Sequence, residues 1–427
     1  MTSRSARARP GRTNPASSSR PESLGGLPGD IAPLTGVRFF AALWVVLHHV
    51  KGDLFGEDPT LIPAALTPVK RFFDLGYLAV PMFFILSGFI LSHTYFARYT
   101  VRGHLAFVYL RFARLWPVHL ASLLLLMVYV GIVVARGARA EDGGYVFAAL
   151  PLELAMLRTW FSKDLLWNYP AWSIHAEWFA YLFLFPLAFV SFRSVSRRGP
   201  LLLVIALLVL GHTFLPIQRL PGLCADIVLL FLAGSALYRL RVLSPGLPGS
   251  RVATVGLVLV AVAVVGLFEH SQSLIYLGFA ALIFGLSYDG GWLAPLLSRR
   301  AIVYGGLISY SLYMAHAVVL KFHAAAAQKL GIQAPALRIL ASAAFVGAAL
   351  LAASALYHVI EAPCNAMLRR RNPFRLAPGG HPLAEPVRAA TPANVALRSV
   401  LRREGVRRRA KRVTYPASGS RGSTSGT

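Results

Sequence analysis

The chain has 427 residues, of which 56% are hydrophobic and only 14% are charged, and its mean hydropathy is +0.58. Soluble globular domains average roughly 45–50% apolar and about 25% charged residues. The composition therefore argues against a disordered protein, a disulfide scaffold and an ordinary soluble enzyme, and it favours a membrane protein.

The positive charge is concentrated towards the two ends of the chain. The formal net charge is +26; residues 1–30 contain five arginines against two acidic residues, and residues 369–427 contain fourteen Lys or Arg against two. In a soluble domain such a charge would suggest binding to nucleic acid, but no nucleic-acid motif accompanies it. We therefore expect no nucleic-acid partner and favour membrane lipids, anionic ones in particular.

Ten segments are apolar and close to the length of about 20 residues that a spanning helix needs. They are 34–51, 76–96, 117–135, 172–192, 200–216, 223–241, 252–268, 272–289, 302–321 and 338–360. The shorter segment 145–158 contains Glu153 and is interpreted as an interfacial or re-entrant helix; if it spanned, there would be eleven spans and the C-terminus would lie outside. The expected fold class is all-α, a polytopic transmembrane helical bundle of about ten spans.

Basic residues recur in alternate connections, as the positive-inside rule requires for cytoplasmic loops. These residues are Arg98, Arg102, Arg111, Arg114, Arg193, Arg197, Arg198, Arg241, Arg251, Arg299 and Arg300. An even number of spans then places both termini in the cytoplasm. We expect a disordered cytoplasmic tail over 1–33, a membrane domain over 34–365 and a basic, mostly disordered cytoplasmic tail over 366–427. The expected location is the plasma membrane.

The first predicted span carries ionisable residues on one face. Arg38 and His49 are eleven residues apart, which on a helix places them within about 20° of each other and about 16 Å apart along the axis, whereas His48 points roughly 80° away. A neutral His can take a proton near pH 7, and an Arg keeps its own. The spacing suits a base, His49, and a fixed cation in one channel, or else an interfacial His pair with an arginine that snorkels inward.

Ser173, Glu177 and Tyr181 recur at intervals of four and share one face of another predicted span. A carboxylate inside a span must face the bundle interior or a water-filled cavity. We expect Glu177 to orient a histidine or to bind a sugar hydroxyl, or else to be the structural partner of an arginine.

Arg111 and Arg114 lie three residues apart at a predicted cytoplasmic edge of the membrane. Two guanidinium groups on one face suit the phosphates of a nucleotide-bearing thioester donor. The alternative is ordinary positive-inside anchoring.

Ser309, Tyr313 and His316 lie on one stripe of the predicted span 302–321. The stripe is expected to complete the wall of a substrate cavity. The alternative is that these side chains form hydrogen bonds between helices.

Seven short segments follow one another along the chain in a specific order. They are Gly36–Val37–Arg38 with ten residues between Arg38 and His49, FFILSGFIL at 83–91, RFARLWPVH at 111–119, WSIHAEWFAYLFLFP at 172–186, FLAGSALY at 231–238, ISYSLYMAH at 308–316 and YHVIEAP at 357–363. Together they resemble the acyltransferase-3 family of integral membrane acyltransferases, which modify sugars and other surface or secreted molecules. The resemblance covers residues 34–365.

The resemblance implies a membrane O-acyltransferase. The donor would be acyl-CoA, commonly acetyl-CoA, delivered from the cytoplasm, with no permanently bound cofactor and no metal. The acceptor would be a hydroxyl of a glycan, a lipid-linked sugar or a glycosylated small molecule. His49 would be the general base, Arg38 would hold the donor or orient His49, and Glu177 would position the acceptor or tune the histidine.

A second class of function is compatible with the same spans and buried polar residues. A multi-span transporter of a sugar or polymer precursor would need no acyl-transfer activity, but it would not explain the ordered motifs. A lipid-surface scaffold that acts through its basic tail would leave the buried Arg38 and Glu177 unexplained.

Overall fold

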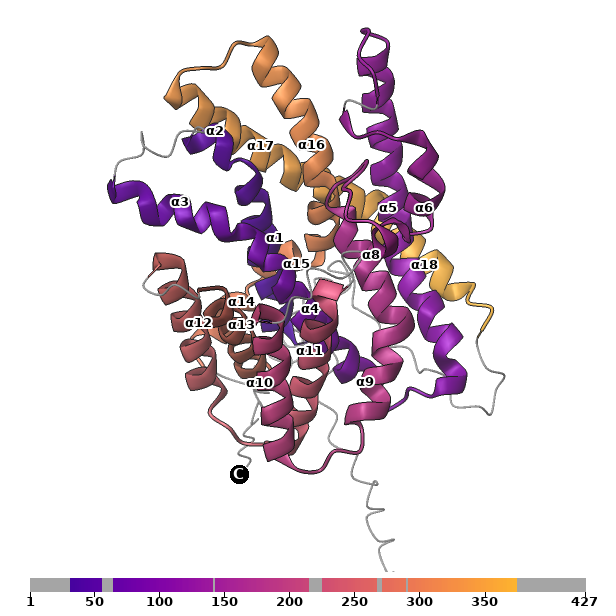
Figure 1. The fold of residues 1–427 in the computed structure, drawn as a ribbon, viewed down its shortest axis with the longest axis vertical. Helices are drawn as coiled ribbons and strands as arrows, with labels where there is room; N and C mark the ends of the chain where they lie inside the picture. The colour runs from indigo at the N-terminus through magenta and orange to yellow at the C-terminus, as the bar shows by residue number, and fades with distance from the viewer. Residues whose placement is uncertain are drawn as a thin grey trace, which may run out of the picture. The chain divides into compact units, whose positions relative to one another are not determined.

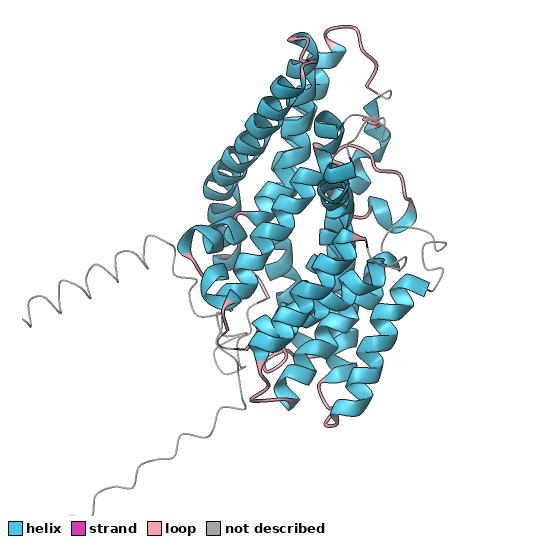
Figure 2. Ribbon diagram, turned by 90° about the vertical axis from the view of Figure 1, so that its left-hand side faces the viewer, coloured by secondary structure: helices cyan, strands magenta, loops and turns pink. Residues whose placement is uncertain are grey.

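The computed structural model describes residues 31–55, 64–140, 143–214, 225–266, 271–288 and 291–374. The chain divides into one unit over 1–383 and another over 384–427, and every element described below belongs to the first. Within the described ranges all regular elements are helices and no strand is present (Figure 2). The expected all-α class is confirmed. The predicted disordered tails lie outside the described residues over 1–30 and 375–427, but α1 begins at Ala32 and α18 continues to Arg370, so both tails are shorter than predicted at their inner ends.

The helices are labelled in chain order (Figure 1). They are α1 Ala32–His49, α2 Lys51–Phe55, α3 Thr67–Asp74, α4 Ala79–Tyr95, α5 His104–Val134, α6 Leu150–Leu154, α7 Arg158–Phe161, α8 Ala171–Phe179, α9 Phe185–Phe192, α10 Arg198–Phe214, α11 Ala225–Leu243, α12 Gly249–Val265, α13 Ser271–Leu286, α14 Leu293–Leu297, α15 Arg300–Leu307, α16 Ser309–Lys329, α17 Pro335–Leu356 and α18 Ala362–Arg370. A π-helical turn over Ala180–Leu184 joins α8 to α9.

Each of the ten predicted segments falls on a helix or on consecutive helices. Four helical stretches are long and apolar enough to cross a membrane: Thr67–Tyr95, Val101–Val134, Ala171–Phe192 and Pro335–Arg370. The pair α15 and α16 is a fifth if its bend of 64° lies within one span, and three further apolar helices have 10–17 residues. Within the described ranges there are therefore four or five candidate spans, and the predicted number of ten is not confirmed. The segment 145–158 contains α6, whose five residues rise only about 7.5 Å.

The third span is predicted to begin at Pro117, but the helix that contains it begins earlier in the chain. The helix α5 runs from His104 through Pro117 to Val134, because a proline inside a membrane helix is tolerated where neighbouring groups bind the freed backbone atoms. The carbonyl oxygen that lacks its helical partner is that of Ala113, four residues before Pro117; close to it, the Tyr310 hydroxyl donates to the Leu115 carbonyl oxygen at 2.6 Å. As a result the arginine pair of α5 lies inside a helix of membrane length.

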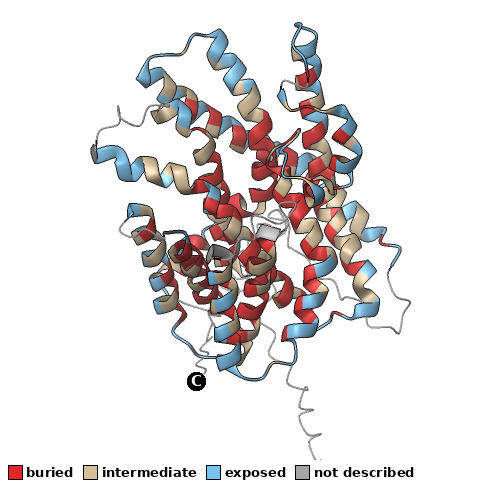
Figure 3. Ribbon diagram, viewed as in Figure 1, coloured by how far each residue is buried: buried red, intermediate tan, exposed pale blue. Residues whose placement is uncertain are grey.

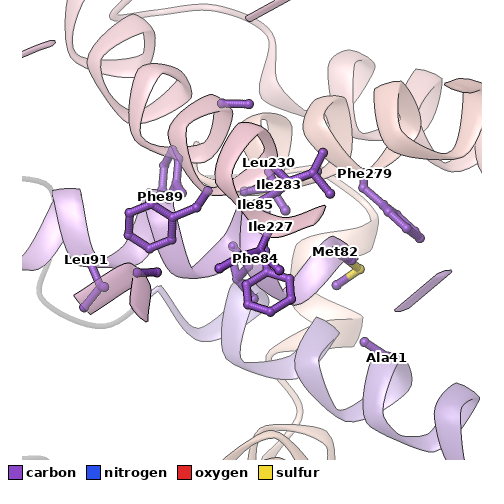
Figure 4. Packing of buried hydrophobic residues seen from close by; sticks show 14 of the residues in the cluster. Ala41, Met82, Phe84, Ile85, Phe89, Leu91, Ile227, Leu230, Phe279 and Ile283 are labelled. Atoms are coloured by element: carbon purple, nitrogen blue, oxygen red, sulfur yellow. The ribbon is translucent and has the colours of Figure 1, made fainter. Parts of the chain in front are cut away.

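The core is built where α4, α11 and α13 meet, with Phe84 and Ile85 of α4 beside Ile227 and Leu230 of α11 (Figure 4). Buried residues line the facing sides of these helices and of α1, while exposed apolar residues lie on the outer sides (Figure 3). An apolar outer surface of this kind is expected where helices meet lipid tails rather than water.

Glycines bring the backbones of α4 and α11 into direct contact. A Cβ atom added at Gly88 would lie 2.0 Å from the Phe231 carbonyl oxygen, and one added at Gly234 would lie 1.9 Å from the Ile85 carbonyl oxygen. Small residues at helix interfaces permit such close approach in membranes. The contact fixes the distance between two helices that both contribute to the cavity described below.

Candidate functional site

His49 ends α1 among aromatic rings from two other parts of the chain. Its ring centroid lies 5.0 Å from that of His316 on α16 and 5.1 Å from that of Tyr169, which lies in the loop before α8. Its Nδ1 is 2.7 Å from the Val45 carbonyl oxygen. Because a carbonyl only accepts, Nδ1 carries the proton and Nε2 is left as the basic nitrogen.

A cavity of about 270 Å³ borders His49. Its wall consists of Val45, His48, His49, Tyr77, Val80, Pro81, Phe84, Leu165, Tyr169, Pro170, Trp172, Ile227, Leu230 and Tyr313. These residues come from α1, the turn Leu75–Leu78, α4, the loop before α8, α8, α11 and α16, so the cavity depends on the packing of several helices. None of the lining residues is Asp, Glu, Lys or Arg, so the polar side chains of the wall are imidazoles, phenols and one indole.

His48 also lines the cavity, contrary to the expectation that it points elsewhere. The short helix α3 folds back over the end of α1, and His48 Nδ1 lies 2.9 Å from the Phe73 carbonyl oxygen of α3. His48 and His49, on different sides of the end of α1, therefore both line the cavity. The two histidines differ in their neighbours, since His48 faces Tyr77 whereas His49 contacts His316 and Tyr169.

Glu177 lies in a second polar group, away from His49. Its Oε1 accepts hydrogen bonds from the Tyr181 hydroxyl and from Ser87 Oγ at 3.2 Å. Among the described residues no hydrogen bond joins it to a histidine, because α8 turns this face towards α4 and α5. The carboxylate is instead within electrostatic range of Arg38. The alternative interpretation of Glu177 as the partner of an arginine therefore matches the geometry better than its role as a partner of His49.

Five charged side chains form what we call the inner cluster: Arg38, Arg111, Arg114, Glu177 and Glu361. Arg111 belongs to it through Tyr181, whose ring centroid lies 6.0 Å from the Arg111 guanidinium carbon and whose hydroxyl donates to Glu177. Arg38 interacts with Arg114 and with both carboxylates. Arg114 Nη1 lies 3.8 Å from Glu361 Oε1, which agrees with the expectation that Glu361 pairs with an arginine. Arg38 is not part of the wall of the His49 cavity, so the predicted single channel is not seen. Three cations against two anions leave the cluster with a net positive charge.

The two arginines of α5 have different neighbours. Arg111 is buried, donates to the Tyr95 hydroxyl and lies 5.1 Å from the centroid of the Tyr95 ring. Arg114 has a side chain that is 26% exposed. The spacing of three residues predicts a common face for the pair, but Arg111 is buried whereas the Arg114 side chain is partly exposed.

Of the five residues expected to line a substrate cavity, only Tyr313 belongs to its wall. Ser173 supports it, since its Oγ donates to the Tyr313 hydroxyl at 2.9 Å. His316 lies against His49. Ser309 lies at the start of α16, where its Oγ donates to the Gly306 carbonyl oxygen at 2.8 Å, and Tyr181 belongs with Glu177. Hydrogen bonds between and within helices account for Ser173, Tyr181 and Ser309.

Tyr169 was not predicted from the sequence. Its ring packs on His49 and His316, and its loop is held in place by Asn168, whose Nδ2 donates to Ser122 Oγ at 3.1 Å and to the Met314 carbonyl oxygen at 3.2 Å. Trp167 in the same loop has a φ of 53°, an uncommon conformation for a bulky residue. The only available signal was the position of Tyr169 three residues before the Trp-Ser motif.

A buried polar cluster that the sequence did not predict fastens α6 to α5 and α8. Glu153 Oε2 lies 3.5 Å from His175 Nε2, and His119 Nε2 lies 2.7 Å from the Glu153 carbonyl oxygen. All three residues are at most 2% exposed. No group of three His, Cys, Asp or Glu side chains in the described part of the chain can hold a metal ion, and we interpret the cluster as a brace for the connection between α5 and α8.

The Glu153 carboxyl should make the protein less stable at alkaline pH. Burial raises the pKa of Glu153 to about 7, which the nearby Arg158 only partly opposes. Because the folded pKa exceeds the unfolded one, near 4.5, the stabilising contribution is complete below pH 4.5 and is lost as the pH rises through 7. Thermal unfolding of the purified protein should show a lower midpoint at pH 8 than at pH 5. In Glu153→Gln this difference should shrink; an equal drop in both proteins would contradict the assignment.

Comparisons with known proteins identify the family of the chain. The sequence profile of the acyltransferase-3 family, described as an acyltransferase domain, matches residues 31–358. Acyltransferase MdmB of Streptomyces mycarofaciens is 27% identical over 381 residues, which are 81% of this chain and 94% of that protein. Protein 2 in the picA locus of Rhizobium radiobacter is 32% identical over 159 residues, which are 34% of this chain and 75% of that protein. No solved structure matches. Since the profile covers His49, every residue of the inner cluster except Glu361, and most of the helical bundle, the chain belongs to the acyltransferase-3 family of membrane acyltransferases.

Proposed function

We propose that the protein is a membrane O-acyltransferase that moves an acyl group, acetyl in the simplest case, from acyl-CoA to a hydroxyl of a glycan, a lipid-linked sugar or a glycosylated small molecule. The proposal rests on one observation: His49 lines a cavity and has its Nε2 as the basic nitrogen. Family membership supports the reaction type. The aromatic wall of the cavity suits one ring of a sugar, whose apolar faces pack on tyrosine and tryptophan.

In this reaction His49 acts as a general base. Its Nε2 takes the proton of the acceptor hydroxyl while the hydroxyl oxygen bonds to the thioester carbonyl carbon. The carbon–sulfur bond then breaks, and the departing sulfur of CoA takes the proton back from His49, so the products are an ester and a free thiol. Base catalysis of this kind contributes about 10²–10⁴-fold. A covalent acyl-histidine is less favoured and would give ping-pong kinetics.

The inner cluster is the proposed site for the phosphates of the donor. Its net positive charge attracts anions, and guanidinium groups bind phosphate in a bidentate manner. Arg38 and Arg114 are the better candidates, because Arg111 is buried and donates to the Tyr95 hydroxyl, whereas the Arg114 side chain is partly exposed. Glu177 then holds Arg38 in place rather than contacting the acceptor.

Changing the arginines of α5 should separate donor binding from folding. Arg111→Ala and Arg114→Ala together should raise the apparent KM for acyl-CoA about tenfold or more, because each charge-assisted hydrogen bond is worth roughly 1.5–3 kcal/mol. Of the single changes, Arg114→Ala should carry most of the KM effect and Arg111→Ala most of the loss of protein. Arg197→Ala, which removes an exposed arginine, is the control for net charge. An unchanged donor KM with a lower yield would show that the pair only anchors the protein.

We further propose ten spans with both termini in the cytoplasm of the cell and the protein in the plasma membrane. The connections that follow α9 and α11 lie at one end of the bundle and the α16–α17 connection lies at the other (Figure 1). The first two connections are flanked by arginines, so the positive-inside rule assigns them to the cytoplasm. His49 then opens towards the outer half of the membrane, where an extracytoplasmic acceptor would reach it.

Reporter fusions test this topology. A reporter fused after residue 372 should report the cytoplasm, and one inserted at 269–271 should report the opposite side. A pair of reporters on the same side would overturn the arrangement of ten spans.

The reaction itself is tested with purified protein, acetyl-CoA labelled in the acetyl group, and a panel of glycans and glycosylated small molecules. Labelled acceptor should form with wild-type protein and not with protein that lacks His49. A transporter would give neither labelled acceptor nor slow hydrolysis of the thioester, and that outcome would refute the proposal.

A further inference from the structure

Among the described residues, no carboxylate forms a hydrogen bond with His49, the proposed base. In many enzymes a histidine base is oriented by an acid that also stabilises its protonated form. Here Nδ1 of His49 is bonded to the carbonyl of Val45, a neutral group, and Glu177 lies with Ser87 and Tyr181. If His49 takes a proton from the acceptor, some other group must stabilise the positive charge.

The titratable groups that face His49 come from four elements. They are His48 on α1, Lys51 on α2, Tyr169 in the loop before α8, and Tyr313 and His316 on α16. None of them is an acid that is ionised near neutral pH, and Lys51 opposes a second positive charge. The stabilising group must therefore be a neutral acceptor.

His316 has an unused acceptor at this position. Its Nδ1 lies 2.6 Å from the Tyr313 carbonyl oxygen, so Nδ1 carries the proton and Nε2 carries a lone pair. That Nε2 is buried and has no hydrogen-bond partner within the described ranges. A buried polar atom without a partner requires an explanation, and this one belongs to a ring whose centroid is 5.0 Å from that of His49.

We propose that His316 is a positioning residue whose Nε2 lone pair stabilises the protonated form of His49 during acyl transfer. The inference rests on the proposed role of His49 as the base. While both rings are neutral, each has Nε2 as an acceptor, so the two rings form no hydrogen bond with each other. Once His49 holds the proton of the acceptor hydroxyl, the lone pair of His316 faces a cation in a site of low dielectric, where such an interaction is strong. Two charged imidazoles at this distance would repel, so the pair takes one proton.

Two substitutions of His316 separate this role from packing. His316→Gln keeps an acceptor oxygen, whereas His316→Leu keeps apolar volume and removes the acceptor. We expect His316→Gln to retain kcat within a few-fold of wild type. We expect His316→Leu to lower kcat about 10²-fold, with little change in either KM, and to move the acid limb of the kcat/KM profile to lower pH, because the protonated base is no longer stabilised.

The matched control is Tyr145→Phe, which removes a buried hydroxyl that has no hydrogen-bond partner among the described residues and that lies outside the cavity wall; it should leave kcat and the pH profile unchanged. The amount of folded protein in each preparation is checked by its thermal midpoint. Equal losses for His316→Gln and His316→Leu, or a loss in His316→Leu without movement of the acid limb, would overturn the proposal.

His49→Ala in the same assay separates this inference from the proposed function. If His49→Ala is inactive and His316→Leu is as active as wild type, the base stands and the role of His316 fails. If His49→Ala stays active while His316→Leu and His316→Gln are both inactive, then His316 itself is the base and both assignments fail.

Discussion

His49→Ala should lower kcat by about 10²-fold or more, and His48→Ala by only a few-fold. The first substitution removes the only imidazole in the cavity wall that contacts both Tyr169 and His316. The second removes a histidine that is bonded to the backbone of α3. Both leave an alanine in a helix that already contains Ala41 and Ala42, so the helix itself should persist.

The assay compares kcat at saturating donor and acceptor, with each variant normalised to the amount of folded protein. Arg38→Lys is a companion change, since it keeps the charge and loses the planar fork; a large loss would show that geometry matters as well as charge. Equal and modest losses for His48→Ala and His49→Ala would remove His49 from its role while leaving the family unaffected.

Gly234→Ala should destabilise the protein and distort the cavity together. The added Cβ would lie 1.9 Å from the Ile85 carbonyl oxygen, whereas even close carbon–oxygen contacts between helices are about 3.3 Å. The obstacle is backbone, so α4 and α11 must move apart by more than one ångström. Overpacking of this kind typically costs about 1–3 kcal/mol, occasionally more. Because α4 and α11 supply Phe84 and Leu230 to the cavity wall, activity should fall as well.

The control is Gly347→Ala in α17, where an added Cβ meets no atom within 4 Å. This change should leave the thermal midpoint unchanged or raise it, because Ala is the better helix former. If Gly234→Ala unfolds at the wild-type temperature with wild-type kcat, the two helices are free to separate and the cavity does not depend on their contact.

The spacing of Ser173, Glu177 and Tyr181 predicts a polar face on α8 and the turn that follows it, because such a pattern depends on the helical repeat alone. The same arithmetic cannot show what each face meets. In α1 it separates His49 from His48, yet both line the cavity and Arg38 does not. For Glu177 it left open a histidine, a sugar hydroxyl or an arginine, and its hydrogen-bond partners are Ser87 on α4 and Tyr181.

Long-range contacts decided the features that the sequence did not predict. Arg111 and Arg114 have similar local sequence, yet Tyr95 occupies one and Glu361, far along the chain, pairs with the other. Tyr169 reaches the site because a loop is fixed by Asn168 to two distant helices. Local spacing carries no information about such partners.

The break between α15 and α16 places the amino end of a helix inside the bundle. The first amide groups of a helix have no partner within it and carry about half an elementary positive charge. Glu361, which is 2% exposed, meets this end: its Oε2 accepts from Ser311 Oγ at 2.7 Å, and the backbone N–H of Ser311 also contributes. The buried carboxylate is therefore compensated by the dipole of α16 as well as by Arg114, as anions are at helix amino ends generally. A continuous helix through Ile308 would lack that end, so the bend itself supplies a fixed positive potential that neither pH nor lipid composition can remove.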